Sequence, residues 1–471
     1  MFLLFGGSPY LRCTNRTLTN WILHSSLIAG LSKSHKNNEL VLVRIVYRML
    51  LYFVLGFLLN SVLCQNVTNE TNVNVDDIDD FYPNIQWSDA FDWKLLKTLS
   101  NESSNVLISP LSLRLVLAIL YEGSSGATQR EFESVLRFTQ KDTLREEFKS
   151  SLDALQNSTD GENVLKICTS LFLDSSVEAK EKYAETIKQY YYTDLVPSNF
   201  SDPESASSQI NAWVEEATLG LVSHLTQPED LDAMTLLLAN AVYFKGIWRY
   251  KFPKENTKVD KFYVSPEQAI YIPFMTITEQ FFYYESSVLD AKILRLPYKS
   301  SNISMFIVLP LSKGGLPELI RKINLVDLHR ELFQMNKKLI QVSIPKFQFK
   351  FKASYYNLLK DYGFRTMFQN TASFTQIVKG HSSILRKLVV SDILQTTGIQ
   401  VDEEGSIAYA ATDVIVGNKI GVPDSTFNAS HPFLFFLQED KEGTVFFVGK
   451  IENPLQQELE IRRNKSDEQE I

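Results

Sequence analysis

Residues 401–427, VDEEGSIAYAATDVIVGNKIGVPDSTF, decide how this chain is interpreted. The middle of the stretch is small, apolar and β-branched, which is typical of a buried strand. The flanks are an acidic pair and a segment of Gly, Pro and Asp, which is typical of an exposed loop. Lys419 is the only basic residue between Glu404 and Phe427. The stretch therefore has the features of a loop and of a strand at once.

Side-chain alternation divides this stretch into two sets, because successive residues of a strand face opposite sides of a sheet. One set is uniformly small and consists of Ser406, Ala408, Ala410 and Thr412. The other set holds the bulky and charged residues, namely Ile407, Tyr409, Ala411 and Asp413. The small set predicts a face that can enter a crowded interior, where a large or charged side chain would overpack or stay unpaired. The alternative is a merely flexible loop.

Composition indicates a globular protein with a sizeable core. The chain has 471 residues, of which 44% are hydrophobic and 22% are charged. The net charge of −8, without a stripe of Lys and Arg, argues against a nucleic-acid partner. Helical patterns come first and long strand patterns later, with no internal repeat or linker between them. This order predicts one α+β domain over residues 85–455.

The first 84 residues are expected to lie outside that domain. Residues 49–64 follow Arg44 and Arg48, are apolar and end in a cleavage-like Val-Leu-Cys, which predicts a secretory signal peptide. Residues 1–48 would then be an upstream extension of the reading frame, and residues 65–84 a flexible acidic leader. A signal anchor is the alternative, but the apolar run falls short of the about 20 residues that a membrane span needs.

The mature protein is therefore expected to be secreted and extracellular, with no membrane segment. A protein on that route can carry glycans. Acceptor triplets begin at Asn66, Asn69, Asn101, Asn157, Asn199, Asn302, Asn428 and Asn464, and several of these short matches are expected by chance. Cys13 and Cys64 fall in the segments expected to be lost, so Cys168 would be a lone cysteine and is interpreted as a buried small hydrophobe. Residues 456–471 form a polar tail that is expected to be disordered.

Motifs of catalysis and metal binding are missing from the sequence. It has no G-x-S-x-G, no H-E-x-x-H and no phosphate-binding glycine loop. Its six histidines lack partners at ligand spacing, and His431 is interpreted as a residue of the core or of a sheet end. The sequence thus predicts no enzyme, no metal site and no cofactor. A heparin cofactor is not expected either, because residues 140–157 alternate in charge.

Eight blocks of the sequence carry a further signal through their order. They are NVLISPLSLRLVLAIL, GATQREFESVL, INAWVEEATLG, LLLANAVYFKGIWRYKF, LRLPYKSSNISMFIVLP, IPKFQF, VDEEGSIAYAAT and FNASHPFLFFLQEDKEGTVFFVGKIENP. Taken in this order, they resemble the serpin family. Together they cover about residues 85–455. The resemblance implies a single serpin domain with three β-sheets, eight or nine α-helices and an exposed reactive-centre loop near the C-terminus.

The resemblance also implies roles for particular residues. The hinge of the loop would be Glu403, Glu404, Gly405, Ser406, Ala408, Ala410 and Thr412. In inhibitory members the cleaved bond lies about seventeen positions along, counting Glu403 as the first, which places it at Lys419-Ile420. Ser109, Ser112 and Asn240 match the shutter positions beneath the central sheet, and Gln395 stands where the family usually has histidine. Trp248 matches the breach position, although ordinary aromatic packing explains it equally well.

The implied function is that of a secreted, monomeric inhibitor of serine-type endopeptidases. A trypsin-like serine protease would cleave after Lys419, whose ammonium suits an acidic specificity pocket. Insertion of the hinge into the central sheet would then trap the protease as an acyl-enzyme. The alternative is a non-inhibitory serpin that acts as a carrier, storage protein or chaperone. Tyr409 and Ile407 favour this alternative because they depart from the alanine-rich hinge of the family.

Overall fold

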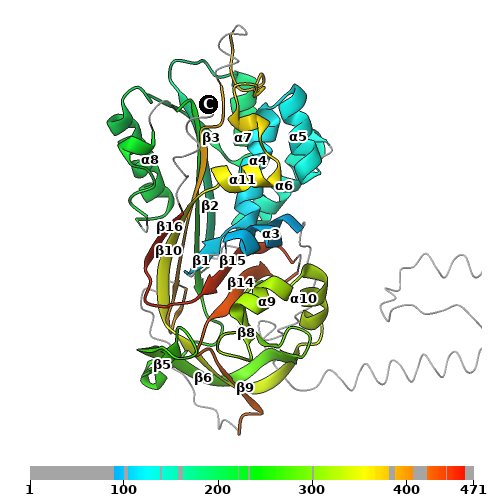
Figure 1. The fold of residues 1–471 in the computed structure, drawn as a ribbon, viewed down its shortest axis with the longest axis vertical. Helices are drawn as coiled ribbons and strands as arrows, with labels where there is room; N and C mark the ends of the chain where they lie inside the picture. The colour runs from blue at the N-terminus through cyan, green and yellow to red at the C-terminus, as the bar shows by residue number, and fades with distance from the viewer. Residues whose placement is uncertain are drawn as a thin grey trace, which may run out of the picture. The chain divides into compact units, whose positions relative to one another are not determined.

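A computed structural model describes residues 90–99, 104–137, 140–157, 163–220, 222–231, 234–299, 302–380, 388–406, 422–441 and 443–461 of the chain. These residues belong to one compact unit, residues 79–471. They form nine α-helices together with sixteen strands (Figure 1), so the prediction of an α+β fold is confirmed. The predicted extension, signal peptide and leader, residues 1–84, lie outside the described residues, as do Asn66, Asn69, Asn101 and Asn464.

The helices range from 7 to 17 residues, and most of them lie on one side of the fold (Figure 1). They are α3 (Ala90–Leu99), α4 (Pro110–Gly123), α5 (Gly126–Leu136), α6 (Lys141–Asn157), α7 (Glu181–Tyr191), α8 (Pro203–Ala217), α9 (Leu316–Lys322), α10 (Leu325–Leu332) and α11 (Tyr356–Tyr362). The most buried of them is α4, which begins with Pro110 at its first position, where the missing N–H costs nothing. None of the helices in the described part of the chain is long and apolar enough to cross a membrane.

Seven strands form the central sheet. Its order is β16 (Glu458–Ile461), β10 (Phe347–Ser354), β11 (Asp392–Val401), β4 (Leu236–Ile247), β2 (Val164–Asp174) and β3 (Asp194–Ser198), with β12 (Gly405–Ser406) paired to β4. The middle pair, β11 and β4, is parallel, and its register extends from Asp392/Leu237 to Gly398/Tyr243. Beyond that point β12 pairs with β4 in the antiparallel sense.

Nine strands form the second sheet. Its order is β1 (Val106–Ile108), β15 (Val445–Ile451), β14 (Phe433–Glu439), β8 (Ile303–Pro310), β7 (Ala291–Pro297), β6 (Ala269–Ser286), β9 (Asn336–Pro345) and β13 (Ser425–Asn428), with β5 (Lys258–Tyr263) on β6. The described strands thus form two hydrogen-bonded networks rather than the three expected sheets. The reason is β6, whose 18 residues pair with β5 at the N-terminal end, with β9 along the middle and with β7 at the C-terminal end.

Two hydrophobic clusters cover the two faces of the central sheet. Alternate residues of β4 divide between them: Leu236, Leu238 and Val242 face the main core, which includes α4. Leu237, Ala239 and Ala241 face the smaller cluster under α8. Figure 1 shows α8 and α4 on opposite sides of this sheet. The sheet is therefore buried on both faces, which explains why β4 reads as a continuous apolar run.

Three expectations about single residues and segments can be checked here. Cys168 is partly rather than fully buried beside the α8 cluster, and burial raises the pKa of its thiol. His431 is buried at a strand end, with Nε2 2.8 Å from the Pro310 carbonyl, as expected. The prediction of a disordered tail is wrong for Glu458–Ile461, which form the edge strand β16. The tail is ordered there because Glu458 and Glu460 form ion pairs with Lys350 and Lys352 of β10.

Candidate functional site

The segment predicted to be the hinge turns back on itself immediately after β11. The Asp402 carboxylate accepts hydrogen bonds from the Glu404 amide at 3.0 Å and from the Gly405 amide at 3.3 Å. The Asp402 amide in turn donates to the Gly405 carbonyl at 2.9 Å. β12 then runs antiparallel along β4, with Gly405 opposite Ile247 and Ser406 opposite Gly246. The first two residues after the acidic pair are therefore already part of the central sheet.

Ser406 is fully buried at the end of this sheet. Its side chain is 0% exposed, and its Oγ lies 2.8 Å from the Tyr298 hydroxyl. Burial raises the pKa of Tyr298, so its hydroxyl stays protonated. Ser406 is on the inner face, where the alternation of the sequence places the small residues. The rest of the hinge, Ala408, Ala410 and Thr412, lies outside the described residues, as does the predicted bond Lys419-Ile420.

Two glycines lie where the hinge approaches β4, Gly405 on the hinge and Gly246 opposite Ser406. A Cβ atom on Gly405 would overlap the backbone of Gly246 and Ile247. A Cβ atom on Gly246 would lie 2.6 Å from ring atoms of Phe244 and Tyr298. Glycine at position 405 therefore allows the hinge backbone to lie this close to β4, whereas glycine at position 246 leaves room for the two aromatic rings. The sequence singled out Gly405 for the hinge but gave no sign of its partner Gly246.

Trp248 has two roles at this point, one in packing and one in hydrogen bonding. Its ring is stacked on that of Tyr298, with centroids 4.5 Å apart. Its Nε1 donates to the Asp402 carbonyl and its backbone amide to the Glu404 carbonyl, both at 2.9 Å. The two interpretations of Trp248, aromatic packing and contact with the hinge, are thus both true of the structure.

Three lysines surround the acidic pair of the hinge. We call the five residues Glu403, Glu404, Lys251, Lys254 and Lys346 the hinge clamp. Glu403 Oε2 lies 2.7 Å from Lys346 Nζ, and Glu404 lies 3.3 Å from Lys251 Nζ and 3.1 Å from Lys254 Nζ. Thr257 adds a hydrogen bond to Glu403 at 2.8 Å. Burial alone would raise the pKa of both carboxyls, but their lysine partners outweigh burial and hold each pKa below its ordinary value.

Acid should loosen the hinge clamp. Because both pKa values are depressed in the folded chain, the stabilisation is complete above the ordinary value of 4.5 and is lost as pH falls through the lowered values. Glu403→Gln should reproduce the loss at pH 7, with about tenfold faster hydrogen exchange over residues 401–406, since a hydrogen bond to a charged group is worth about 1.5 kcal/mol. Glu318→Gln, on α9, is the matched control, because it removes exposed ion pairs to Arg321 and Lys322.

The measurement is hydrogen exchange of residues 401–406 between pH 7 and pH 3, corrected for the intrinsic exchange rate. We expect exchange to accelerate in acid in the unmodified chain and to vary less with pH in Glu403→Gln. Equal protection at both pH values would show that the ion pairs of the hinge clamp do not hold the hinge.

The residues predicted to form the shutter meet at the middle of the central sheet. Ser112 Oγ donates to Asn240 Oδ1 at 2.5 Å, and Gln395 Nε2 donates to the same atom at 3.0 Å. Ser109 takes part through its backbone, whose amide donates to Gln395 Oε1 at 3.1 Å. The Tyr355 hydroxyl donates to Gln395 Oε1 at 2.9 Å. All five residues are buried, and sequence reasoning missed Tyr355.

This network ties together the two parallel strands in the middle of the sheet. Asn240 on β4 and Gln395 on β11 are directly opposite each other in the register. Their side-chain hydrogen bond therefore crosses the line at which β4 and β11 would have to separate to admit another strand. Gln395 does not titrate, and burial raises the pKa of Tyr355, so the network should not respond to pH in the neutral range.

Comparisons with known proteins agree with the resemblance noted in the sequence. A family model described as Serpin (serine protease inhibitor) matches residues 86–454. Serine protease inhibitor 2 of Anopheles gambiae is 34% identical over 379 residues, which cover 79% of this chain and 92% of that protein.

Solved structures have the same fold. Serpin48 of the insect Tenebrio molitor is 29% identical with a TM-score of 0.69, over 77% of this chain and 96% of its own. Human thyroxine-binding globulin is 23% identical with a TM-score of 0.70, over 78% and 97%, and this likeness concerns the fold alone.

Proposed function

Because this chain belongs to the serpin family, we propose that it inhibits serine proteases by acting as a suicide substrate. The family consists mostly of protease inhibitors. The observation that carries the proposal is the position of Gly405 and Ser406, which already pair with β4 at the end of the central sheet. A longer segment that continues from Ser406 would extend along β4 without any change in strand direction.

In the proposed mechanism a trypsin-like protease attacks the carbonyl carbon of Lys419. The Lys419-Ile420 peptide bond breaks, the Ile420 amine leaves with the C-terminal part, and an ester joins Lys419 to the protease serine. The released hinge then enters between β4 and β11. A strand of about 16 residues spans roughly 50 Å at about 3.3 Å per residue. The attached protease would be carried that distance before water can hydrolyse the ester.

Entry of the hinge requires the two parallel strands to part. The hydrogen bond between Asn240 and Gln395 crosses their boundary, so the shutter would set part of the barrier. Ser406 is already on the inner face, and alternation would bring Ala408, Ala410 and Thr412 to the same face. The hinge clamp would hold the loop at the start of this path until cleavage.

Secretion and glycosylation form part of the proposal. The predicted signal peptide, residues 49–64, supports secretion. Asn199, Asn302 and Asn428 are exposed, as a glycan acceptor must be. We propose a monomer that meets its protease outside the cell.

A non-inhibitory carrier is the second candidate. Thyroxine-binding globulin, whose name states a ligand rather than a protease, has the same fold. Tyr409 and Ile407 are also bulkier than the alanines usual in inhibitory hinges. A carrier would be cut in its loop without retaining the protease.

Incubation with trypsin separates the two candidates. We expect an adduct that resists SDS and a released peptide that begins at Ile420, found by N-terminal sequencing. Cleavage of the loop by a protease that is not trapped should raise the melting temperature by roughly 20 °C, which at about 2 °C per kcal/mol is roughly 10 kcal/mol. Cleavage without an adduct and without thermal stabilisation would contradict the proposal and favour the carrier.

A further inference from the structure

The C-terminal segment adds an outer strand to the central sheet. β16 pairs in parallel with β10, from Glu458 opposite Lys350 to Ile461 opposite Ala353. The Lys350 amide donates to the Gln457 carbonyl at 2.7 Å. β10 would otherwise be the outermost strand on this side, with a row of backbone groups available for pairing.

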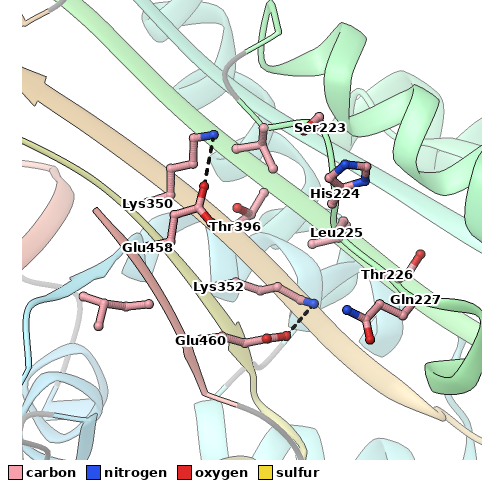
Figure 2. Close-up of a pocket in the computed structure, with 12 residues that line it drawn as sticks. Ser223, His224, Leu225, Thr226, Gln227, Lys350, Lys352, Thr396, Glu458 and Glu460 are labelled. Atoms are coloured by element: carbon pink, nitrogen blue, oxygen red, sulfur yellow. Dashed lines mark ion pairs between the residues drawn. The ribbon is translucent and has the colours of Figure 1, made fainter. Parts of the chain in front are cut away.

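The side chains of β16 match those of β10 in both charge and apolarity. Glu460 lies 2.6 Å from Lys352 Nζ, and Glu458 lies 3.7 Å from Lys350 Nζ. Figure 2 shows both ion pairs on one side of a pocket. The pocket has a volume of about 380 Å³, and residues 222–227 line its other side. Leu459 and Ile461 point the other way and pack against the main core. The strand is therefore recognised on both of its faces.

A buried asparagine directs the chain toward this edge. Asn105 is 0% exposed, and its Oδ1 accepts hydrogen bonds from the amides of Glu452 at 2.7 Å and Asn453 at 2.9 Å. Its Nδ2 donates to the Asn453 carbonyl at 2.8 Å. The turn after β15 is thus fixed, and residues 452–457 form a short tether that gives the strand a high effective concentration at β10.

The opposite edge of the same sheet is protected differently. β3 contains Pro197, which has no backbone N–H to offer to an incoming strand. β10 has no proline, and its outward face carries Lys350 and Lys352. Pairing of two β10 edges would put lysine next to lysine, which is unfavourable. The edge at β10 therefore selects a strand with acidic residues at alternate positions.

We propose that the outer edge of β10 is a strand-accepting site for an acidic extended peptide, and that the C-terminal segment is its tethered ligand. The ligand class is an extended segment that alternates Glu with an aliphatic residue, as in Glu458–Ile461. Lys350 and Lys352 select the charge, and the adjoining core selects the aliphatic side chains. This site is separate from the hinge and from the loop that a protease would cleave.

Full-length variants test the site without any protease, so the result is independent of the proposed inhibition. Glu458→Lys with Glu460→Lys should speed exchange of the Lys350 amide about tenfold, because attraction at two positions becomes repulsion. The peptide LQQELEI, added at about 1 mM, should restore protection in this variant, whereas LQQKLKI should not. The Phe351 amide, which by alternation points to β11, is the internal control.

A compensating variant guards against a general loss of structure. Adding Lys350→Glu and Lys352→Glu to the two tail substitutions should restore protection without any peptide. The proposal is overturned if the tail substitutions leave exchange at Lys350 unchanged, if the two peptides protect equally, or if neither peptide protects.

Discussion

Replacing Lys419 with glutamate should abolish inhibition of trypsin-like proteases and leave the fold intact. A trypsin-type specificity pocket holds a carboxylate that pairs with a lysine or arginine of the substrate. Placing like charges together in a closed contact costs several kcal/mol, and each 1.4 kcal/mol is a factor of ten. We therefore expect the rate of adduct formation to fall by at least about 1,000-fold, measured as the second-order rate of trypsin inactivation.

Lys419→Arg is the matched control, since arginine also carries the positive charge that such a pocket binds. It should retain inhibition, and both variants should melt at the temperature of the unmodified chain. Undiminished inhibition by Lys419→Glu would show that the cleaved bond lies elsewhere in the loop.

Changing Ser406 to arginine should convert the proposed inhibitor into a substrate. Ser406 is 0% exposed and hydrogen-bonded to Tyr298, so the larger side chain would overpack the inner face and bury an unpaired charge. That cost should slow the insertion of the hinge into the central sheet more than it slows the hydrolysis of the ester between Lys419 and the protease. We expect the amount of chain consumed per trapped protease to rise from near equimolar to about ten or more, since several kcal/mol exceeds the 1.4 kcal/mol that makes one factor of ten.

Ile407→Arg is the control for this experiment. Alternation assigns its side chain to the opposite face, level with Lys245 of β4, which is only partly buried, so a charge there should change the stoichiometry much less than Ser406→Arg does. Gel densitometry of adduct and cleaved chain gives the ratio. The same stoichiometry in both variants would contradict the assignment of the small residues to the inner face.

The sequence was sufficient for the parts of the site that depend on local pattern. Ordered blocks predict the α+β fold, and the alternation of small residues assigns Ser406 to the inner face, where the structure places it. Trp248 is likewise at the end of the sheet beside the hinge. The assignment of Ser406 rests on strand periodicity, which is a property of neighbouring residues, whereas the position of Trp248 was implied by the family resemblance.

Partners that are distant in the chain could not be predicted in this way. Lys346 is 57 positions from Glu403, and no pattern around either residue joins them. Tyr298 and Tyr355 read as ordinary aromatic residues, although each donates or shares a hydrogen bond with a residue of the hinge or the shutter.

The ordered strand in the tail and the joining of strands into two sheets could not be predicted from local sequence pattern either, for the same reason. The segment Glu458–Ile461 looks like a soluble tail until the lysines of β10 are placed beside it. The joining of sheets through β6 depends on which strands meet along its length. Each of these features is set by tertiary contacts, which override local propensity.

The opposed directions of the strands explain where the energy for trapping would come from. β4 and β11 run the same way, whereas β12 runs against β4. A strand growing from β12 into the gap would run against both neighbours. One parallel ladder would be exchanged for two antiparallel ones, which are slightly stronger per residue. On the proposed mechanism the uncut chain would therefore be metastable, because its central sheet would gain one further strand only after the loop is cleaved.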